Sequence, residues 1–182
     1  MSKETASRIN ELLSPTGKTL STAESCTGGN IAHIITSISG ASCFFKGAVV
    51  AYSAEIKCAL LGVDPKVIET KGIVSSDVAV AMAEGAKRLI GSDYSVATTG
   101  WAEGPGDEHE CGGCCWIAVS GPSGTVSVRS CNNGSRISNI DKFSDVALLT
   151  LLEYITDSLN KLLSANIITL FLYKTKMLLT HL

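Results

Sequence analysis

Segments with the pattern of a β-strand alternate along the chain with segments that have the pattern of an α-helix. The clearest helix follows Ser75 or Ser76, and its apolar residues recur every three or four positions from Val78 to Ile90. We predict helices at 4–13, 31–38, 54–61, 76–90 and 138–163, and strands at 18–22, 44–52, 94–99, 114–120 and 125–131. Such alternation predicts a sheet that is covered by helices on both faces.

The last two predicted strands are joined by Gly121-Pro122-Ser123-Gly124, a segment with the composition of a hairpin turn. A hairpin makes its two strands antiparallel, whereas strands connected through helices run parallel. The sequence therefore predicts a single three-layer α/β/α domain with a mixed, mostly parallel sheet of about five strands. We assign this domain to residues 1–163 and treat residues 164–182 as a C-terminal extension.

The composition excludes several classes of protein. The chain has 182 residues, of which 45% are hydrophobic, so it can bury enough surface to avoid disorder. Its formal net charge of −2 lacks the positive excess of a nucleic-acid-binding protein. No apolar run reaches the length of about 18 residues that a membrane-spanning helix needs. We therefore expect neither nucleic acid nor a membrane as a partner.

The N-terminus and the cysteines indicate the cell compartment. Residues 1–5 are polar and contain no apolar core, so we expect no signal peptide. The seven cysteines are an odd number at irregular spacing, which is not typical of a disulfide framework. Both observations favour a cytoplasmic protein.

The segment 22–29 joins a predicted strand to a predicted helix and is the first candidate site. Its hydroxyls, on Ser25 and Thr27, and its glycines, Gly28 and Gly29, stand at a helix N-terminus, where backbone N–H groups can bind a phosphate or carboxylate. The alternative is an ordinary helix cap with a tight turn. The lysine of a P-loop is absent, which disfavours ATP hydrolysis.

A second candidate site combines Ser42, Tyr52 and Lys57. A serine hydroxyl becomes a nucleophile when a base lies next to it, and a lysine can be that base if burial lowers its pKa. Tyr52 could relay a proton or orient the lysine. Three such residues also occur near one another in proteins without this chemistry, so spacing alone leaves the choice open.

A third candidate site is the cysteine cluster at 109–115, in which His109, Cys111 and Cys114 have the residue types of a zinc site. A structural zinc site needs a second ligand pair, and none has clear spacing here. A redox pair is disfavoured because no helix follows the two cysteines. We therefore assign no metal and no other cofactor.

Several motifs, taken in order along the chain, resemble those of a known family. They are Thr22-Ala-Glu-Ser-Cys-Thr-Gly-Gly29, Gly40-Ala-Ser42, Val50-Ala-Tyr52-Ser53 with Lys57, Leu61-Gly-Val63, Gly72-Ile-Val-Ser75, Met82-Ala-Glu-Gly85-Ala, Thr99-Gly100 and Trp116-Ile-Ala118. They resemble the C-terminal domain family of the competence- and damage-inducible protein CinA, the nicotinamide-nucleotide amidohydrolases. The similarity covers roughly residues 5–160.

The resemblance implies a homo-oligomeric cytoplasmic enzyme of pyridine-nucleotide salvage, without a metal, that hydrolyses nicotinamide mononucleotide to nicotinate mononucleotide and ammonia. It identifies Ser42 as the nucleophile, Lys57 as the base and Tyr52 as the assisting residue. It also implies that the substrate contacts the 25–29 turn, Thr99, Gly100 and, through its phosphate, Arg136.

The chain departs from this family around the substrate. A family stretch Thr-Gly-Ile-Ala-Gly-Pro is here Thr99-Gly-Trp101-Ala-Glu103-Gly-Pro105, which adds a negative charge. A lysine-bearing stretch is replaced by Glu110-Cys-Gly-Gly-Cys-Cys115. These changes favour an alternative hypothesis, in which the chain keeps the fold as a nucleotide-binding or regulatory module that has lost turnover.

Overall fold

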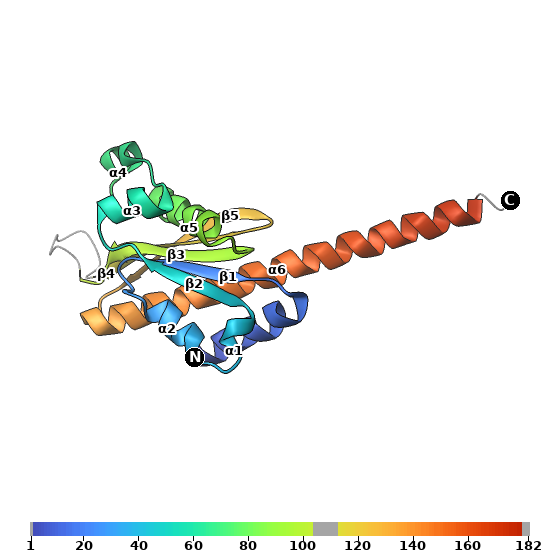
Figure 1. Cartoon of the computed structure of the whole chain (residues 1–182), viewed down its shortest axis with the longest axis horizontal. Helices are drawn as coiled ribbons and strands as arrows, with labels where there is room; N and C mark the ends of the chain where they lie inside the picture. The colour runs from blue at the N-terminus through green and yellow to red at the C-terminus, as the bar shows by residue number, and fades with distance from the viewer. Residues whose placement is uncertain (1, 104–112, 180–182) are drawn as a thin grey trace.

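A five-stranded sheet with the spatial order β2-β1-β3-β4-β5 forms the middle layer of the protein (Figure 1). The computed structural model describes residues 2–103 and 113–179. The strands are β1 (Leu20–Glu24), β2 (Phe45–Val50), β3 (Tyr94–Trp101), β4 (Gly113–Gly121) and β5 (Gly124–Asn132). β1 pairs in parallel with β2 and with β3, whereas β4 runs antiparallel to both of its neighbours. The predicted mixed, mostly parallel α/β sheet is confirmed.

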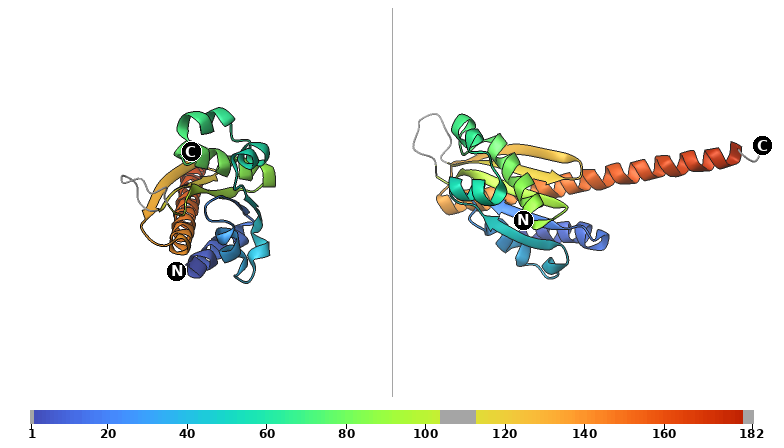
Figure 2. Two further views of the ribbon diagram at one scale, coloured as in Figure 1. Left: turned by 90° about the vertical axis from the view of Figure 1, so that its left-hand side faces the viewer. Right: turned by 45° about the horizontal axis from the view of Figure 1, so that its top comes forward.

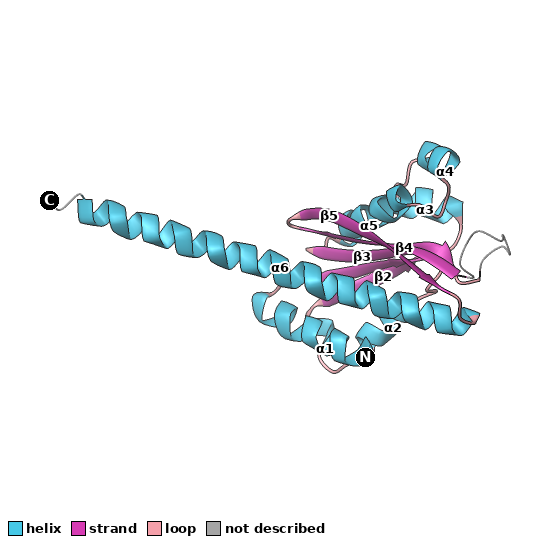
Figure 3. Ribbon diagram, turned by 180° about the vertical axis from the view of Figure 1, so that it is seen from behind, coloured by secondary structure: helices cyan, strands magenta, loops and turns pink. Residues whose placement is uncertain are grey.

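Helices cover both faces of this sheet (Figures 2 and 3). One face carries α1 (Ser2–Leu13), α2 (Asn30–Thr36) and α6 (Arg136–Leu179), and the other carries α3 (Ala54–Leu61), α4 (Pro65–Lys71) and α5 (Ser76–Ile90). Two short 3₁₀ turns, Ser14–Thr16 and Ala41–Cys43, complete the described elements. The three layers follow from the alternation of strands and helices along the chain.

The two faces of the central strands bury different apolar residues, because successive side chains of a strand point to opposite sides. On β4, Ile117 and Val119 pack with the core under α1, α2 and α6, where Phe143 and Leu148 of α6 are fully buried. Ala118 of the same strand packs with the core under α5. Both faces of β4 are therefore buried, which agrees with the nearly continuous apolar run in its sequence.

The connections between the parallel strands place a crevice at one end of the sheet. The chain passes from β1 to β2 through α2 on one face, and from β2 to β3 through α3, α4 and α5 on the other. The two connections therefore leave the carboxyl ends of the neighbouring strands β1 and β2 towards opposite faces of the sheet. In open α/β sheets this divergence is the usual place for a ligand.

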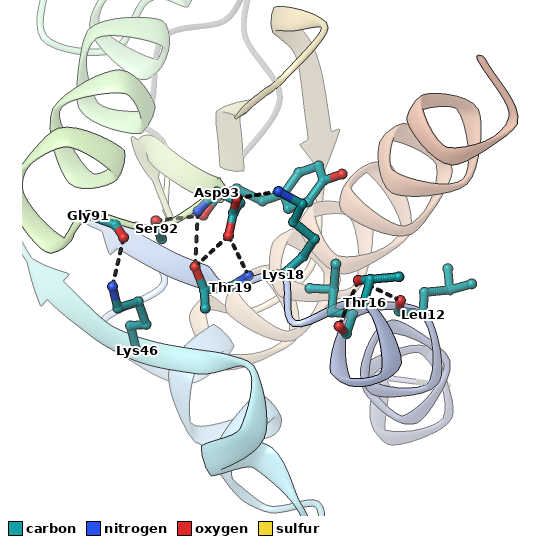
Figure 4. A network of polar contacts seen from close by, with 10 residues as sticks. Leu12, Thr16, Lys18, Thr19, Lys46, Gly91, Ser92 and Asp93 are labelled. Atoms are coloured by element: carbon teal, nitrogen blue, oxygen red, sulfur yellow. Dashed lines mark hydrogen bonds and ion pairs between the residues drawn. The ribbon is translucent and has the colours of Figure 1, made fainter. Parts of the chain in front are cut away.

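The opposite end of β1 and β3 is closed by a polar network (Figure 4). Asp93 accepts hydrogen bonds from the Lys18 ammonium at 2.8 Å and from the backbone N–H and hydroxyl of Thr19 at 2.9 and 2.8 Å. Burial alone would raise the pKa of the Asp93 carboxyl, but the bonds from Lys18 and Thr19 outweigh it and hold the pKa below its ordinary value. The network ties the starts of the two strands together.

Two elements differ from the sequence prediction. The helix α4 was not predicted, although its signals are present: Asp64 caps it by accepting from the Lys66 N–H, and Pro65 occupies its first turn. The last helix, predicted over 138–163, extends from Arg136 to Leu179 without interruption. The predicted extension therefore begins as a continuation of α6, and the helix projects away from the sheet (Figure 1). Over the described residues, no helix has the length and apolar character needed to cross a membrane.

Candidate active site

Ser25 and Lys57 meet at the carboxyl end of the sheet. Ser25 is the first residue after β1, and Lys57 stands in the first half of α3. The Lys57 ammonium nitrogen donates hydrogen bonds to the Ser25 Oγ at 2.8 Å and to the Ala51 carbonyl at 2.7 Å. Lys57 is only 1% exposed. A serine hydroxyl and a buried amine are thus in direct contact.

The surroundings of Lys57 favour the neutral amine. Burial lowers the pKa of Lys57, and the nearby thiols of Cys26 and Cys58 oppose this only in part. Within residues 2–103 and 113–179, no carboxylate oxygen lies within 4.0 Å of the Lys57 nitrogen. A buried lysine without an acidic partner loses its proton more easily, which lets it act as a base.

Helix α3 holds Lys57 in place through its ends. Ser53 caps the start by accepting a hydrogen bond from the Ile56 N–H, and Gly62 ends the helix in the left-handed conformation. The end of α3 packs directly on α5 at Gly85, where an added Cβ would lie 2.8 Å from the carbonyl carbon of Leu61. The absence of a side chain at Gly85 is what allows this close approach.

The turn that carries Ser25 is organised by the buried carboxylate of Glu24. One of its oxygens accepts hydrogen bonds from the backbone N–H groups of Gly29 and Ile31, both at 3.0 Å, and the other accepts from Ala32 at 2.8 Å. The Thr27 hydroxyl adds a further bond of 2.8 Å. The first turn of α2 is therefore already occupied by an anion that belongs to the chain itself.

This arrangement corrects the anion-binding role predicted for Thr27, Gly28 and Gly29. The N–H of Gly29 and the hydroxyl of Thr27 are both used by Glu24, and the N–H of Gly28 donates to the Ser25 carbonyl. A substrate phosphate would have to displace the Glu24 carboxylate. The turn therefore positions Ser25, and its N–H groups at Gly28 and Gly29 are already paired within the chain.

A cavity of about 240 Å³ opens beside Ser25 and Lys57. The residues that line it are Ser25, Cys26, Tyr52, Lys57, Ile73, Val74, Thr99, Gly100, Trp101, Ala102, Glu103 and Arg136. They come from the ends of β1 and β3, from the segments around α3 and α5, and from the start of α6. The cavity thus lies at the crevice that the strand connections create.

The walls of the cavity include four further residues predicted from the sequence. Thr99 donates a hydrogen bond of 2.8 Å to the Ile73 carbonyl, which ties β3 to the segment before α5. An added Cβ on Gly100 would lie 2.7 Å from the Cα of Cys115, so only glycine permits the pairing with β4 here. At the mouth, the Arg136 guanidinium donates to the Tyr52 hydroxyl at 2.9 Å.

The predicted contact between Ser42 and Lys57 is wrong. Ser42 is exposed in the 3₁₀ turn before β2, whereas Lys57 follows the other end of that strand. A strand of six residues spans about 20 Å, so the two side chains lie at opposite ends of the sheet. Ser25 takes the place that was predicted for Ser42.

A model of the CinA C-terminal domain matches residues 2–155, which is most of the chain. The chain belongs to this family. A CinA-like protein of Synechococcus sp. (strain RCC307) is 48% identical over 120 residues, covering 65% of the chain and 29% of the relative. A CinA-like protein of Mycobacterium avium (strain 104) is 40% identical over 164 residues, covering 85% of the chain and 38% of the relative. The chain thus matches less than half the length of these relatives.

Solved structures of the CinA superfamily have the same fold. The competence damage-inducible protein A of Klebsiella pneumoniae is 30% identical, with a TM-score of 0.80 over 85% of this chain and 97% of that chain. A competence/damage inducible protein of Agrobacterium tumefaciens is 33% identical, with a TM-score of 0.79 over 84% of this chain and 94% of that chain. The CinA fold therefore accounts for nearly the whole of these structures.

The cysteine cluster is described only in part, because His109 and Cys111 lie outside the described residues. Cys114 contacts Cys131 across the β4–β5 pair, at 3.0 Å between the two sulfurs, and accepts a bond from the Arg129 guanidinium. Over the residues that the structure describes, no three His, Cys, Asp or Glu side chains are grouped as metal ligands.

Ser25 could have been identified from the strand pattern. In a parallel sheet, residues that follow strands gather at one edge and residues that precede strands gather at the other. Ser25 follows β1 and Lys57 follows β2, but Ser42 precedes β2. This order along the chain already separates Ser42 from Lys57.

Proposed function

We propose that this domain is an amidohydrolase that converts nicotinamide mononucleotide to nicotinate mononucleotide and ammonia, with Ser25 as nucleophile and Lys57 as base. The observation that supports it most directly is the 2.8 Å hydrogen bond between a buried lysine and a serine that lines a cavity. The choice of nicotinamide mononucleotide as the substrate rests on the resemblance to the nicotinamide-nucleotide amidohydrolases. The same resemblance supports a cytoplasmic homo-oligomer that uses no metal.

The reaction begins when Lys57 takes the Ser25 proton as the serine oxygen attacks the carboxamide carbon. Lys57, now protonated, then gives this proton to the amide nitrogen, which leaves as ammonia. Water attacks the resulting ester, and nicotinate mononucleotide is released as Ser25 is reprotonated. Lys57 is suited to both transfers because burial lowers its pKa.

The backbone next to Ser25 offers donors for the oxyanion. In the described part of the chain, the N–H groups of Cys26 and Thr27 have no acceptor, whereas the N–H groups of Gly28 and Gly29 are both used. Cys26 also lines the cavity. We assign the oxyanion to the Cys26 N–H, a contribution that is typically worth about 3 kcal/mol in the transition state.

Other cavity residues would hold the substrate. Thr99 and Gly100 line the wall beyond Ser25, and Tyr52 and Arg136 form the mouth. Arg136 is the residue that we assign to the substrate phosphate, because a guanidinium binds phosphate oxygens through two donors.

A nucleotide-binding or regulatory module without turnover is the second candidate function. It is favoured by Glu103, whose carboxylate lines the cavity 3.9 Å from the Arg136 guanidinium. A carboxylate at this position repels the phosphate of the substrate and so weakens its binding. In this alternative, Ser25 and Lys57 would still be in contact but would not hydrolyse the bound nucleotide.

Ammonia release distinguishes the two functions. We expect the wild-type protein to release ammonia from nicotinamide mononucleotide, and the Lys57→Met variant to bind the nucleotide without releasing ammonia. The variant should remain folded, since methionine fills a buried site of similar length. Binding by the wild type without any ammonia would favour the regulatory module.

A further inference from the structure

The mouth of the cavity combines a positive and a negative side chain from distant segments. Glu103 follows β3, and Arg136 is the first residue of α6. The Glu103 Oε2 lies 3.9 Å from one terminal nitrogen of Arg136, while the other terminal nitrogen donates to the Tyr52 hydroxyl. Both terminal nitrogens of the guanidinium thus have a partner within the protein.

This pairing weakens the attraction of Arg136 for a phosphate. Over the described residues, the cavity is lined by two basic groups, Lys57 and Arg136, and by one carboxylate, Glu103. At the mouth itself, the charges of Arg136 and Glu103 balance each other. A phosphate dianion at the mouth must displace Glu103 from Arg136 and is repelled by it.

The same wall suits a positively charged ring. Trp101 lines the cavity close to Glu103 and is 40% exposed. An aromatic face and a carboxylate both attract a cation, and the ring of an N-substituted pyridinium carboxamide is cationic. The wall therefore favours the ring of the substrate over its phosphate.

From these contacts we infer that Glu103 is a specificity-determining residue. It favours binding of the pyridinium ring and cancels most of the affinity that the substrate phosphate would add. The inference rests on the proposed function, since it concerns how the same site chooses its substrate. It implies that nicotinamide riboside, which lacks the phosphate, is bound about as well as nicotinamide mononucleotide.

Binding to Ser25→Ala protein, which cannot consume the ligand, tests the inference by calorimetry. The preference is the Kd of the riboside divided by the Kd of the mononucleotide. In the double variant Ser25→Ala/Glu103→Gln this ratio should be about fivefold higher than in Ser25→Ala. The control Ser25→Ala/Glu69→Gln makes the same change of charge on the exposed face of α4 and should leave this preference unchanged. An unchanged preference in the Glu103→Gln protein overturns the inference, as does a failure of both ligands to bind.

Ammonia release by the proteins with Ser25 intact separates this inference from the proposed function. If the preference shifts in binding but no protein releases ammonia, the hydrolysis is wrong and the role of Glu103 stands. If ammonia is released and the Glu103→Gln substitution leaves the preference unchanged, the hydrolysis stands and the role of Glu103 is wrong.

Discussion

The ammonium nitrogen of Lys57 lies 2.8 Å from the Ser25 hydroxyl oxygen, and the two residues belong to different strand-to-helix connections. β1 and β2 are parallel neighbours, so the segments that follow them emerge at the same edge. The sheet itself therefore brings the serine and the lysine together. The lysine is held there without a carboxylate partner among the described residues.

The pH dependence of turnover should follow Lys57. Because burial lowers its pKa below the ordinary value of 10.5, a substantial neutral fraction exists at a lower pH than for an exposed lysine. We expect kcat/KM for ammonia release to rise with pH and to level off once Lys57 is neutral. A rate that is independent of pH between about 6 and 10, with the protein folded throughout, would contradict this role.

Glu24→Gln should destabilise the protein. The substitution replaces one carboxylate oxygen by an NH₂ group, which cannot accept from the buried N–H groups that Glu24 serves. We expect the free energy of unfolding in urea to fall by about 2 kcal/mol. The control Glu11→Gln changes an exposed side chain of α1 and should alter it by less than about 0.5 kcal/mol. Equal effects of the two substitutions would show that Glu24 does not organise the turn.

Asp93→Asn should weaken the end of the sheet opposite the cavity. The variant loses the ion pair with Lys18, so we expect a loss of about 1 kcal/mol in urea unfolding at pH 7. The folded pKa of Asp93 is below its ordinary value of 3.8, so its contribution is complete above that pH and disappears as the pH falls through the folded pKa. The control is Asp157→Asn, an exposed position in α6. A difference between wild type and Asp93→Asn that stays constant down to the most acidic pH would refute the assignment.

Gly85→Ala should destabilise the protein although alanine is the better helix former. An exposed glycine in a helix normally costs about 1 kcal/mol relative to alanine. At Gly85 the new Cβ would lie 2.8 Å from the Leu61 carbonyl carbon, so α3 must shift and carry Lys57 with it. Thermal unfolding should show a lower Tm, and ammonia release should fall with it. An unchanged or higher Tm would mean that α3 and α5 are not packed this closely.

The fold could be predicted because most of its elements have strong local signals. The signals lie within single segments of the sequence: the apolar stripe of α5, the apolar run of β4, the alternation in β5 and the turn at Gly121–Gly124. The helix α4 was missed because only half a turn of apolar residues follows its cap, although Asp64-Pro65 marks its start. The far end of α6 was missed because its apolar pattern changes after about residue 163.

The site was predicted only in part because it depends on long-range geometry. Tyr52, Lys57, Thr99, Gly100 and Arg136 all line one cavity, together with Ser25. The residue types alone could not decide which serine faces the lysine. They also could not show that Glu24, next to Ser25, fills the helix end that was expected to bind the substrate phosphate. The first depends on the pairing of β1 with β2, and the second on the placement of α2 against the end of β1.

Ammonia release from nicotinamide mononucleotide by Ser25→Ala and Ser42→Ala, measured beside the wild type, tests the identity of the nucleophile. Both substitutions remove one hydroxyl, so Ser42→Ala is a matched control at the opposite end of the sheet. We expect Ser25→Ala to lose ammonia release completely and Ser42→Ala to retain the wild-type rate. Full activity in Ser25→Ala, or its loss in a folded Ser42→Ala protein, would contradict the assignment of Ser25 as the nucleophile.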